Sequence, residues 1–188
     1  MNLIRNEGVE DLTIYVAKDV ELSGSNPDTL IHFWQSTTIT GPGKLTLNGC
    51  IAIVDGKQLT IKDANIEVKQ TTNYAIRGTS GGEKLLISNS NIHAESYSQS
   101  IVQFNGGITI NDSMLEDGLR ISDDGAAICK SDGTYANDVT IYDLEYIVGI
   151  KSLSDSQLEG KEIYNLAGQR LNKTAKGVNI IDGKKVLR

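Results

Sequence analysis

The sequence predicts an all-β protein: a right-handed, single-stranded parallel β-helix of about six rungs over residues 1–149, followed by a short C-terminal tail. Aromatic residues make up only 5% of the 188-residue chain and prolines number two, whereas glycine occurs 19 times. Such a composition, with β-branched residues in short clusters, favours many short strands joined by tight turns. An internal repeat then separates the β-helix from other all-β folds.

The repeat is a pattern of apolar, any, apolar, any, Asx, small, any and apolar residues. Its copies read LTIKDANI (59–66), LLISNSNI (85–92), ITINDSML (108–115) and VTIYDLEY (139–146), and looser rungs occupy 12–22 and 30–47. A spacing of about 25 residues fits the coils of a parallel solenoid, in which equivalent residues stack as ladders. A β-sandwich also has short strands, but it does not normally repeat one word at a fixed offset. The predicted inward ladders are Leu59, Leu85, Ile108 and Val139, and Ile61, Ile87, Ile110 and Ile141.

A second apolar strand precedes each copy. Its predicted inward residues are Ile53, Ile76, Val102 and Ile128, and the neighbouring column is Ala52, Ala75, Ile101 and Ala127. A strand that is apolar on both faces needs a cover, so we expect the C-terminal tail or a further N-terminal segment to pack on it.

A polar column follows the repeat at the same bend of each rung: Asp63, Asn89, Asp112 and Asp143. Asx side chains bond their own backbone at turns and tolerate unusual dihedral angles, which predicts a structural corner ladder. The alternative is an acidic column that holds a cation, because aligned carboxylates repel one another unless they are solvated or bridged. Cys50 and Cys129 fall in distant rungs, so no disulfide is expected between them.

The repeat stops near residue 149, and the polar stretch 150–160 is typical of a linker. Residues 161–188 form a separate tail, in which 178–181 and 184–187 flank Asp182-Gly183 and predict a β-hairpin. The tail holds seven Lys or Arg and two acidic residues, against eleven and twenty-two in residues 1–160. An acidic body without a basic stripe argues against a nucleic-acid partner.

Catalytic and metal-binding motifs are scarce. The pair Asp123 and Asp124 could act as the acid and base of a glycosidase, but a solvated turn is the simpler interpretation, and we assign no catalytic residues. The two histidines, His32 and His93, lack neighbours at metal-ligand spacing, so no metal site is expected. No apolar run is long enough to span a membrane.

Two parts of the chain carry a family resemblance. The stretch EIYNLAGQRLNKTAKGVNIIDGKKVLR resembles the C-terminal sorting-like tails of exported Bacteroides and Prevotella proteins. The words ITGPGKLTLNG, GKQLTIKDANIEV and EKLLISNSNIHAE are similar to the rungs of β-helical carbohydrate-binding domain-containing proteins of such bacteria. The resemblance implies an address outside the cell or on the outer-membrane surface of a Gram-negative bacterium. It also implies polysaccharide binding. We expect no cofactor, and calcium is the alternative that the resemblance leaves open.

The candidate ligand site lies on one edge of the predicted solenoid. Loops 55–57, 78–83, 105–107 and 130–137 are expected to stack on one corner. Their polar and aromatic residues suit a sugar chain. The candidate ligand-binding residues are Arg77, Gln103, Lys130, Asp132 and Tyr135. We therefore expect a non-catalytic, exported or surface protein that is polysaccharide-binding or adhesive. The alternatives are a divergent polysaccharide lyase or glycoside hydrolase of the β-helix type, and a structural spacer.

Overall fold

The computed structural model describes residues 3–24, 29–70, 72–79, 81–144, 150–151, 162–165, 168–171, 178–181 and 184–187. The chain divides into two compact units, 1–143 and 144–188. The first unit ends a few residues before the predicted boundary at 149. Among the described residues no helix has the length and apolar character needed to cross a membrane.

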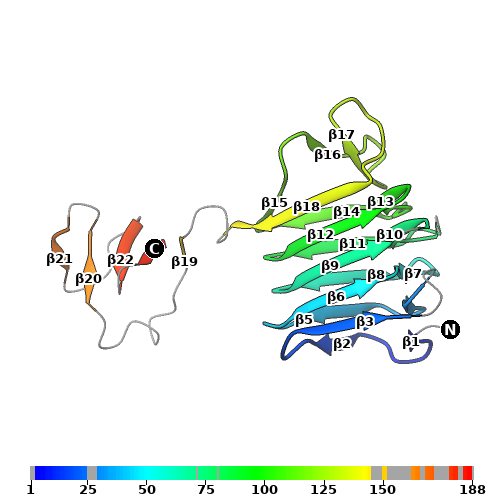
Figure 1. Ribbon diagram of the computed structural model, residues 1–188, viewed down its shortest axis with the longest axis horizontal. Coiled ribbons are helices and arrows are strands. Elements are labelled where there is room, and N and C mark those ends of the chain that lie inside the picture. The colour runs from blue at the N-terminus through cyan, green and yellow to red at the C-terminus, as the bar shows by residue number, and fades with distance from the viewer. Residues whose placement is uncertain are drawn as a thin grey trace. The chain divides into compact units, whose positions relative to one another are not determined.

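The first unit is a parallel β-solenoid of about four turns, in which each coil adds one strand to each of three sheets (Figure 1). Sheet A holds β1 (Ile4–Asn6), β4 (Ile31–Phe33), β7 (Ile51–Ile53), β10 (Tyr74–Arg77) and β13 (Gln99–Val102). Sheet B holds β2 (Leu12–Tyr15), β5 (Thr37–Thr40), β8 (Gln58–Lys62), β11 (Lys84–Ser88) and β14 (Gly107–Asn111). Sheet C holds β3 (Val20–Ser23), β6 (Lys44–Asn48), β9 (Asn65–Gln70), β12 (Asn91–Ser96), β18 (Asp138–Asp143) and β15 (Ser113–Leu115).

The inward ladders of sheet B are those that the repeat predicts. Leu59, Leu85 and Ile108 are in register, as are Ile61, Ile87 and Ile110, because each strand alternates apolar and polar residues with period two. All but the last of these six side chains are buried. The predicted corner column is also present: Asp63, Asn89 and Asp112 all adopt the left-handed backbone conformation at the same bend. The Asn89 amide donates to Asp63 at 2.8 Å.

The predicted sixth rung is wrong in direction. β18 runs antiparallel to both β12 and β15, and therefore lies in sheet C rather than at the end of sheet B. Val139 and Ile141 still face the core, opposite Ala94 and Ile92. Alternation of side chains is the same for either strand direction, so the repeated word could not reveal the reversal. Asp143 accordingly leaves the corner column, and its backbone N–H donates to the Asn91 side chain.

The register predicted for sheet A is off by one or two residues. The structure aligns Ile4, Ile31, Ile51, Ile76 and Ile101 in one ladder. Ala75 and Ile101 are part of the main core, whereas Ala127 packs with Val102 and Cys129 in a small second cluster. Chain residues within the first unit thus bury much of the column for which an additional cover was expected.

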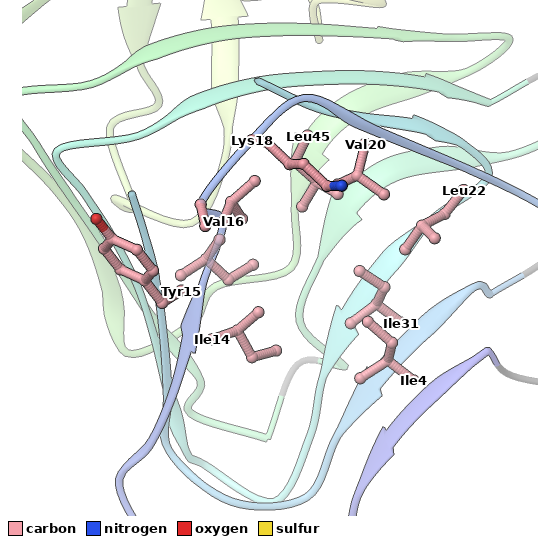
Figure 2. A pocket seen from close by; sticks show the side chains of 11 residues that line it. Ile4, Ile14, Tyr15, Val16, Lys18, Val20, Leu22, Ile31 and Leu45 are labelled. Atoms are coloured by element: carbon pink, nitrogen blue, oxygen red, sulfur yellow. The ribbon is translucent and has the colours of Figure 1, made fainter. Parts of the chain in front are cut away.

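The two ends of the solenoid differ. At the far end, the hairpin of β16 (Leu119–Ile121) and β17 (Ile128–Lys130) and the reversed β18 follow the last coil. At the N-terminal end, apolar side chains line a hollow of about 360 Å³ (Figure 2). Ile4, Ile14 and Leu22 are only partly buried there, and Lys18 lies at its edge.

The second unit contains a sheet of order β19-β23-β22-β20-β21. Its strands are β19 (Ile150–Lys151), β20 (Ile163–Tyr164), β21 (Arg170–Leu171), β22 (Val178–Ile181) and β23 (Lys184–Leu187). β22 and β23 pair antiparallel, and the turn predicted at 182–183 lies outside the described residues. β19 lies in the stretch predicted as a linker and pairs with β23.

Close approach of successive coils makes Gly106 a test of the corner packing. A Cβ added there would lie 2.2 Å from the Gly82 carbonyl oxygen and 2.9 Å from that of Glu83. We expect Gly106→Ala to lower the free energy of unfolding by about 2–3 kcal/mol, because backbone must move. Gly8→Ala is the matched control, since its Cβ would meet nothing within 4 Å. Equal unfolding midpoints for the two variants in urea would contradict this packing.

Candidate functional site

The outer face of sheet A carries the candidate site. Its strands align one outward column along the solenoid: Arg5, His32, Ala52, Arg77 and Val102. Adjacent strands of a sheet lie about 4.8 Å apart, so the column is roughly 19 Å long. We call this column, together with the neighbouring residues Trp34, Tyr74, Gln103 and Tyr135, the sheet A strip.

An aromatic stack occupies the N-terminal end of the strip. The rings of His32 and Trp34 lie 3.7 Å apart between centroids, and the Arg5 guanidinium carbon lies 4.7 Å from the Trp34 ring centroid. Arg5 also pairs with Glu7. The Trp34 backbone N–H donates to the Asn6 carbonyl at 2.8 Å, which holds this corner against the preceding coil. The only tryptophan of the chain is thereby fixed at the surface.

A first cavity, of about 300 Å³, lies in the middle of the strip. Its lining residues are Thr29, Cys50, Asn73, Tyr74 and Arg77. Cys50 is buried, and no disulfide joins it to Cys129, as predicted. The cavity therefore combines one cation with hydroxyl and amide groups.

A second cavity, of about 270 Å³, lies further along the strip, and its lining includes Gln99, Gln103, Asp124 and Tyr135. Gln103 follows β13 directly in the left-handed conformation, with φ of 65°. Tyr135 is half exposed and reaches the cavity from the segment after β17. Val102 and Ala127, which belong to the second apolar cluster, form part of its wall.

Two buried polar atoms of the strip have no hydrogen-bond partner within the described part of the chain: His32 Nε2 and Gln103 Oε1. A buried polar atom without a partner costs free energy, so a bound water or ligand group is its usual explanation. His32 is part of the aromatic stack, and Gln103 lines the second cavity. Both atoms thus mark the same face of the solenoid.

The pKa of His32 lies below its ordinary value. Burial lowers its pKa, and the nearby positive charges of Arg77 and Arg5 lower it further, against the opposing effect of Asp55 and Glu7. Its imidazole is therefore available as a neutral hydrogen-bonding group between two arginines. The strip carries its permanent positive charge on the arginines.

The structure brings together only some of the residues predicted from sequence. Arg77 lines the first cavity, and Gln103 and Tyr135 line the second. Lys130 and Asp132 are exposed and line neither cavity, and Asp132 accepts hydrogen bonds from the backbone N–H and hydroxyl of Thr134 in a tight turn. Sequence reasoning missed the residues of the aromatic stack. The alternation His32-x-Trp34 was the available signal: His32 lies on β4 and Trp34 follows that strand directly, and their rings stack.

The predicted loop corner is correct for three loops. Lys84 N–H donates to Lys57 O at 3.0 Å, and Gly106 N–H donates to Glu83 O at 2.9 Å, so loops 55–57, 78–83 and 105–107 stack. Loop 130–137 was wrongly placed there: the next contact at this corner is Ile108 N–H to Gly125 O. Chain reversal after β15 moves 130–137 to the start of β13, where Ser100 N–H donates to Ala136 O.

Glu83 organises this corner. Its side chain is fully buried, and its carboxylate accepts from Thr79 Oγ1 at 2.8 Å and from the backbone N–H groups of Gly81 (2.8 Å), Thr79 (3.1 Å) and Gly56 (3.3 Å). Burial raises its pKa, but the hydrogen bonds from Thr79 and the backbone outweigh burial and hold the pKa below its ordinary value. The residue is a buried structural anion at the corner of the stacked loops.

The candidate acid pair has the contacts of a turn. Asp124 accepts from Ser122 Oγ at 2.6 Å and from Ala126 N–H at 3.1 Å, while Asp123 pairs with Arg120 at 2.7 Å. Hydrogen bonds from Ser122 and Ala126 lower the pKa of Asp124. Within the described residues, no three His, Cys, Asp or Glu side chains are grouped to hold a metal ion.

The chain matches no protein-family model, no curated protein and no solved structure. The fold and the strip define the class of protein: a β-solenoid with two polar cavities and an aromatic stack along one sheet.

Proposed function

We propose that this is a non-catalytic, exported or surface protein that binds a polysaccharide along the sheet A strip. One observation carries the proposal: an aromatic stack, two polar cavities and both unpartnered buried polar atoms lie on a single face. We also propose that the solenoid winds in the right-handed sense, as the sequence predicts, because parallel crossovers are nearly always right-handed. Export rests on the resemblance of the tail.

The spacing of the strip supports a chain-like ligand. Rungs repeat at about 4.8 Å, which is close to the length of one sugar unit in an extended polysaccharide. The partly exposed Trp34 adds an aromatic ring at one end of the strip, and Tyr74 and Tyr135 add rings with a hydroxyl at the two cavities. Asn73 and Gln103 add amides, which hydrogen-bond sugar hydroxyls in either direction.

The test is binding of the full chain to a panel of polysaccharides by glycan array and affinity electrophoresis. We expect at least one binder, and we expect Trp34→Ala to weaken its binding by about tenfold or more, since tryptophan is among the residues that most often dominate binding interfaces. Tyr15→Ala is the control, because Tyr15 is an exposed aromatic residue, 65% accessible, on sheet B. No binder in the panel, or equal loss in both variants, would refute the proposal. Absence of any ligand would favour the structural spacer.

A second candidate is a divergent polysaccharide lyase or glycoside hydrolase. One observation favours it: Asp124 lines the same cavity as Gln103 and Tyr135. Sugar release from pectic and other acidic polysaccharides, lost in Asp123→Asn and Asp124→Asn, would support an enzyme. We expect no release by the unmodified protein, because Asp123 and Asp124 are engaged within the turn.

A further inference from the structure

The charge of the first cavity indicates which class of polysaccharide the protein binds. This inference rests on the proposed function. Arg77 is the only charged residue among the five that line this cavity. The remaining lining groups on Thr29, Asn73 and Tyr74 are neutral and can donate hydrogen bonds. A cavity with one cation and several donors is suited to an anion.

Arg77 differs from the other described arginines in its partners. Arg5 pairs with Glu7, Arg120 with Asp123 and Arg170 with Glu162, whereas Arg77 has no carboxylate within 4.0 Å among the described residues. Among the described residues its guanidinium makes one long hydrogen bond of 3.4 Å, to the carbonyl of the adjacent Gly78. A guanidinium has five donors in a fixed fork, so the described part of the chain uses little of its hydrogen-bonding capacity.

His32 lies two strands from Arg77 in the same outward column, with the fully buried Ala52 between them. Its Nε2 atom is buried without a hydrogen-bond partner in the described part of the chain. Strand spacing puts the backbones of His32 and Arg77 roughly 10 Å apart, a span that long side chains and one sugar unit can bridge.

We propose that the cavity beside Arg77 binds an anionic substituent of the polysaccharide, a carboxylate or a sulfate ester, and that Arg77 selects for it. The guanidinium fork bonds either group through two parallel N–H donors. The surrounding body is acidic, with eleven Lys or Arg against twenty-two Asp or Glu in residues 1–160. General attraction of polyanions is therefore weak, and the anion is recognised locally.

The experiment uses matched polysaccharides: a uronic-acid polymer and its carboxyl-reduced form, and a sulfated polymer and its desulfated form. Affinities of the full chain are measured by calorimetry at one fixed salt concentration. We expect one anionic form to bind at least about tenfold more tightly than its neutral partner, and the pair that differs identifies the substituent. We expect Arg77→Gln to abolish this preference, so that the ratio of anionic to neutral affinity, measured within the variant, falls to about one.

Two further variants keep the test decisive. Arg77→Lys keeps the charge but not the fork, so we expect intermediate preference and an intact fold. Lys62→Gln removes an exposed charge on sheet B and is expected to change nothing. If neither form of any polymer binds, the proposed function fails. If the anionic and neutral forms bind equally, or Arg77→Gln keeps the preference, the selection by Arg77 is wrong while polysaccharide binding stands.

Discussion

Replacing Phe104 with alanine is expected to lower the free energy of unfolding by about 3–5 kcal/mol, because the change leaves a large cavity in a closely packed core. The Phe104 side chain has no exposed surface. Its backbone N–H donates to Ala126 O at 3.0 Å, and its carbonyl accepts from Gly107 N–H at 2.7 Å. Phe104 thus anchors the last corner of the coil to the segment that follows it.

Urea unfolding at 25 °C measures the effect of Phe104→Ala. The control is Tyr97→Ala, since Tyr97 is 79% exposed and its loss should change the free energy of unfolding by less than about 0.5 kcal/mol. Solenoid coils contact only their neighbours. Relative to wild type, we therefore expect the mutation to speed amide exchange more in β13 and β14 than in β5 and β8. A loss below about 1 kcal/mol would contradict the packing of this end.

Glu83→Gln is expected to cost about 2–3 kcal/mol at neutral pH, because a buried carboxylate loses charge-assisted hydrogen bonds and an amide group must face backbone donors. The pKa of Glu83 in the folded protein lies below its ordinary value. A carboxyl group with a lowered folded pKa adds stability above its unfolded pKa, and this stability is lost as the pH falls through the folded pKa. The variant lacks this pH-dependent part.

Urea unfolding of both proteins across acidic pH tests this account of Glu83. The difference in free energy of unfolding between wild type and Glu83→Gln should be constant near neutral pH and shrink below about pH 4. Thr79→Val removes one donor and should give a smaller loss with the same trend. A difference that stays the same throughout the acidic range would show that the Glu83 carboxylate has no lowered pKa.

The ladders of sheet B could be predicted because strict alternation places Leu59, Leu85 and Ile108 in one register. The Asx corner followed from the same repeat, since Asp63 and Asn89 tolerate the left-handed conformation. The direction of β18 could not be predicted, because period-two alternation carries no direction. The register of sheet A depends on corner loops of unequal length, which sequence spacing alone does not determine.

The candidate site was predictable only in part, for the same reason. Arg77 and Gln103 belong to well-repeated coils, so the sequence placed them near one edge. Arg5 and His32 belong to the first coils, which lack the repeated word, and their pairing across sheet A appears only in three dimensions. Lys130 and Asp132 were misplaced because the hairpin of β16 and β17 reverses the chain.

The most direct test of the central claim maps the ligand onto the three sheets. Backbone amide shifts of the isotope-labelled full chain are followed while the tightest-binding oligosaccharide of the glycan panel is added. Binding along the sheet A strip predicts the largest changes at His32, Trp34, Arg77, Gln103 and Tyr135, with sheets B and C nearly unaffected. Changes confined to sheet B or sheet C would contradict the sheet A strip as the binding face.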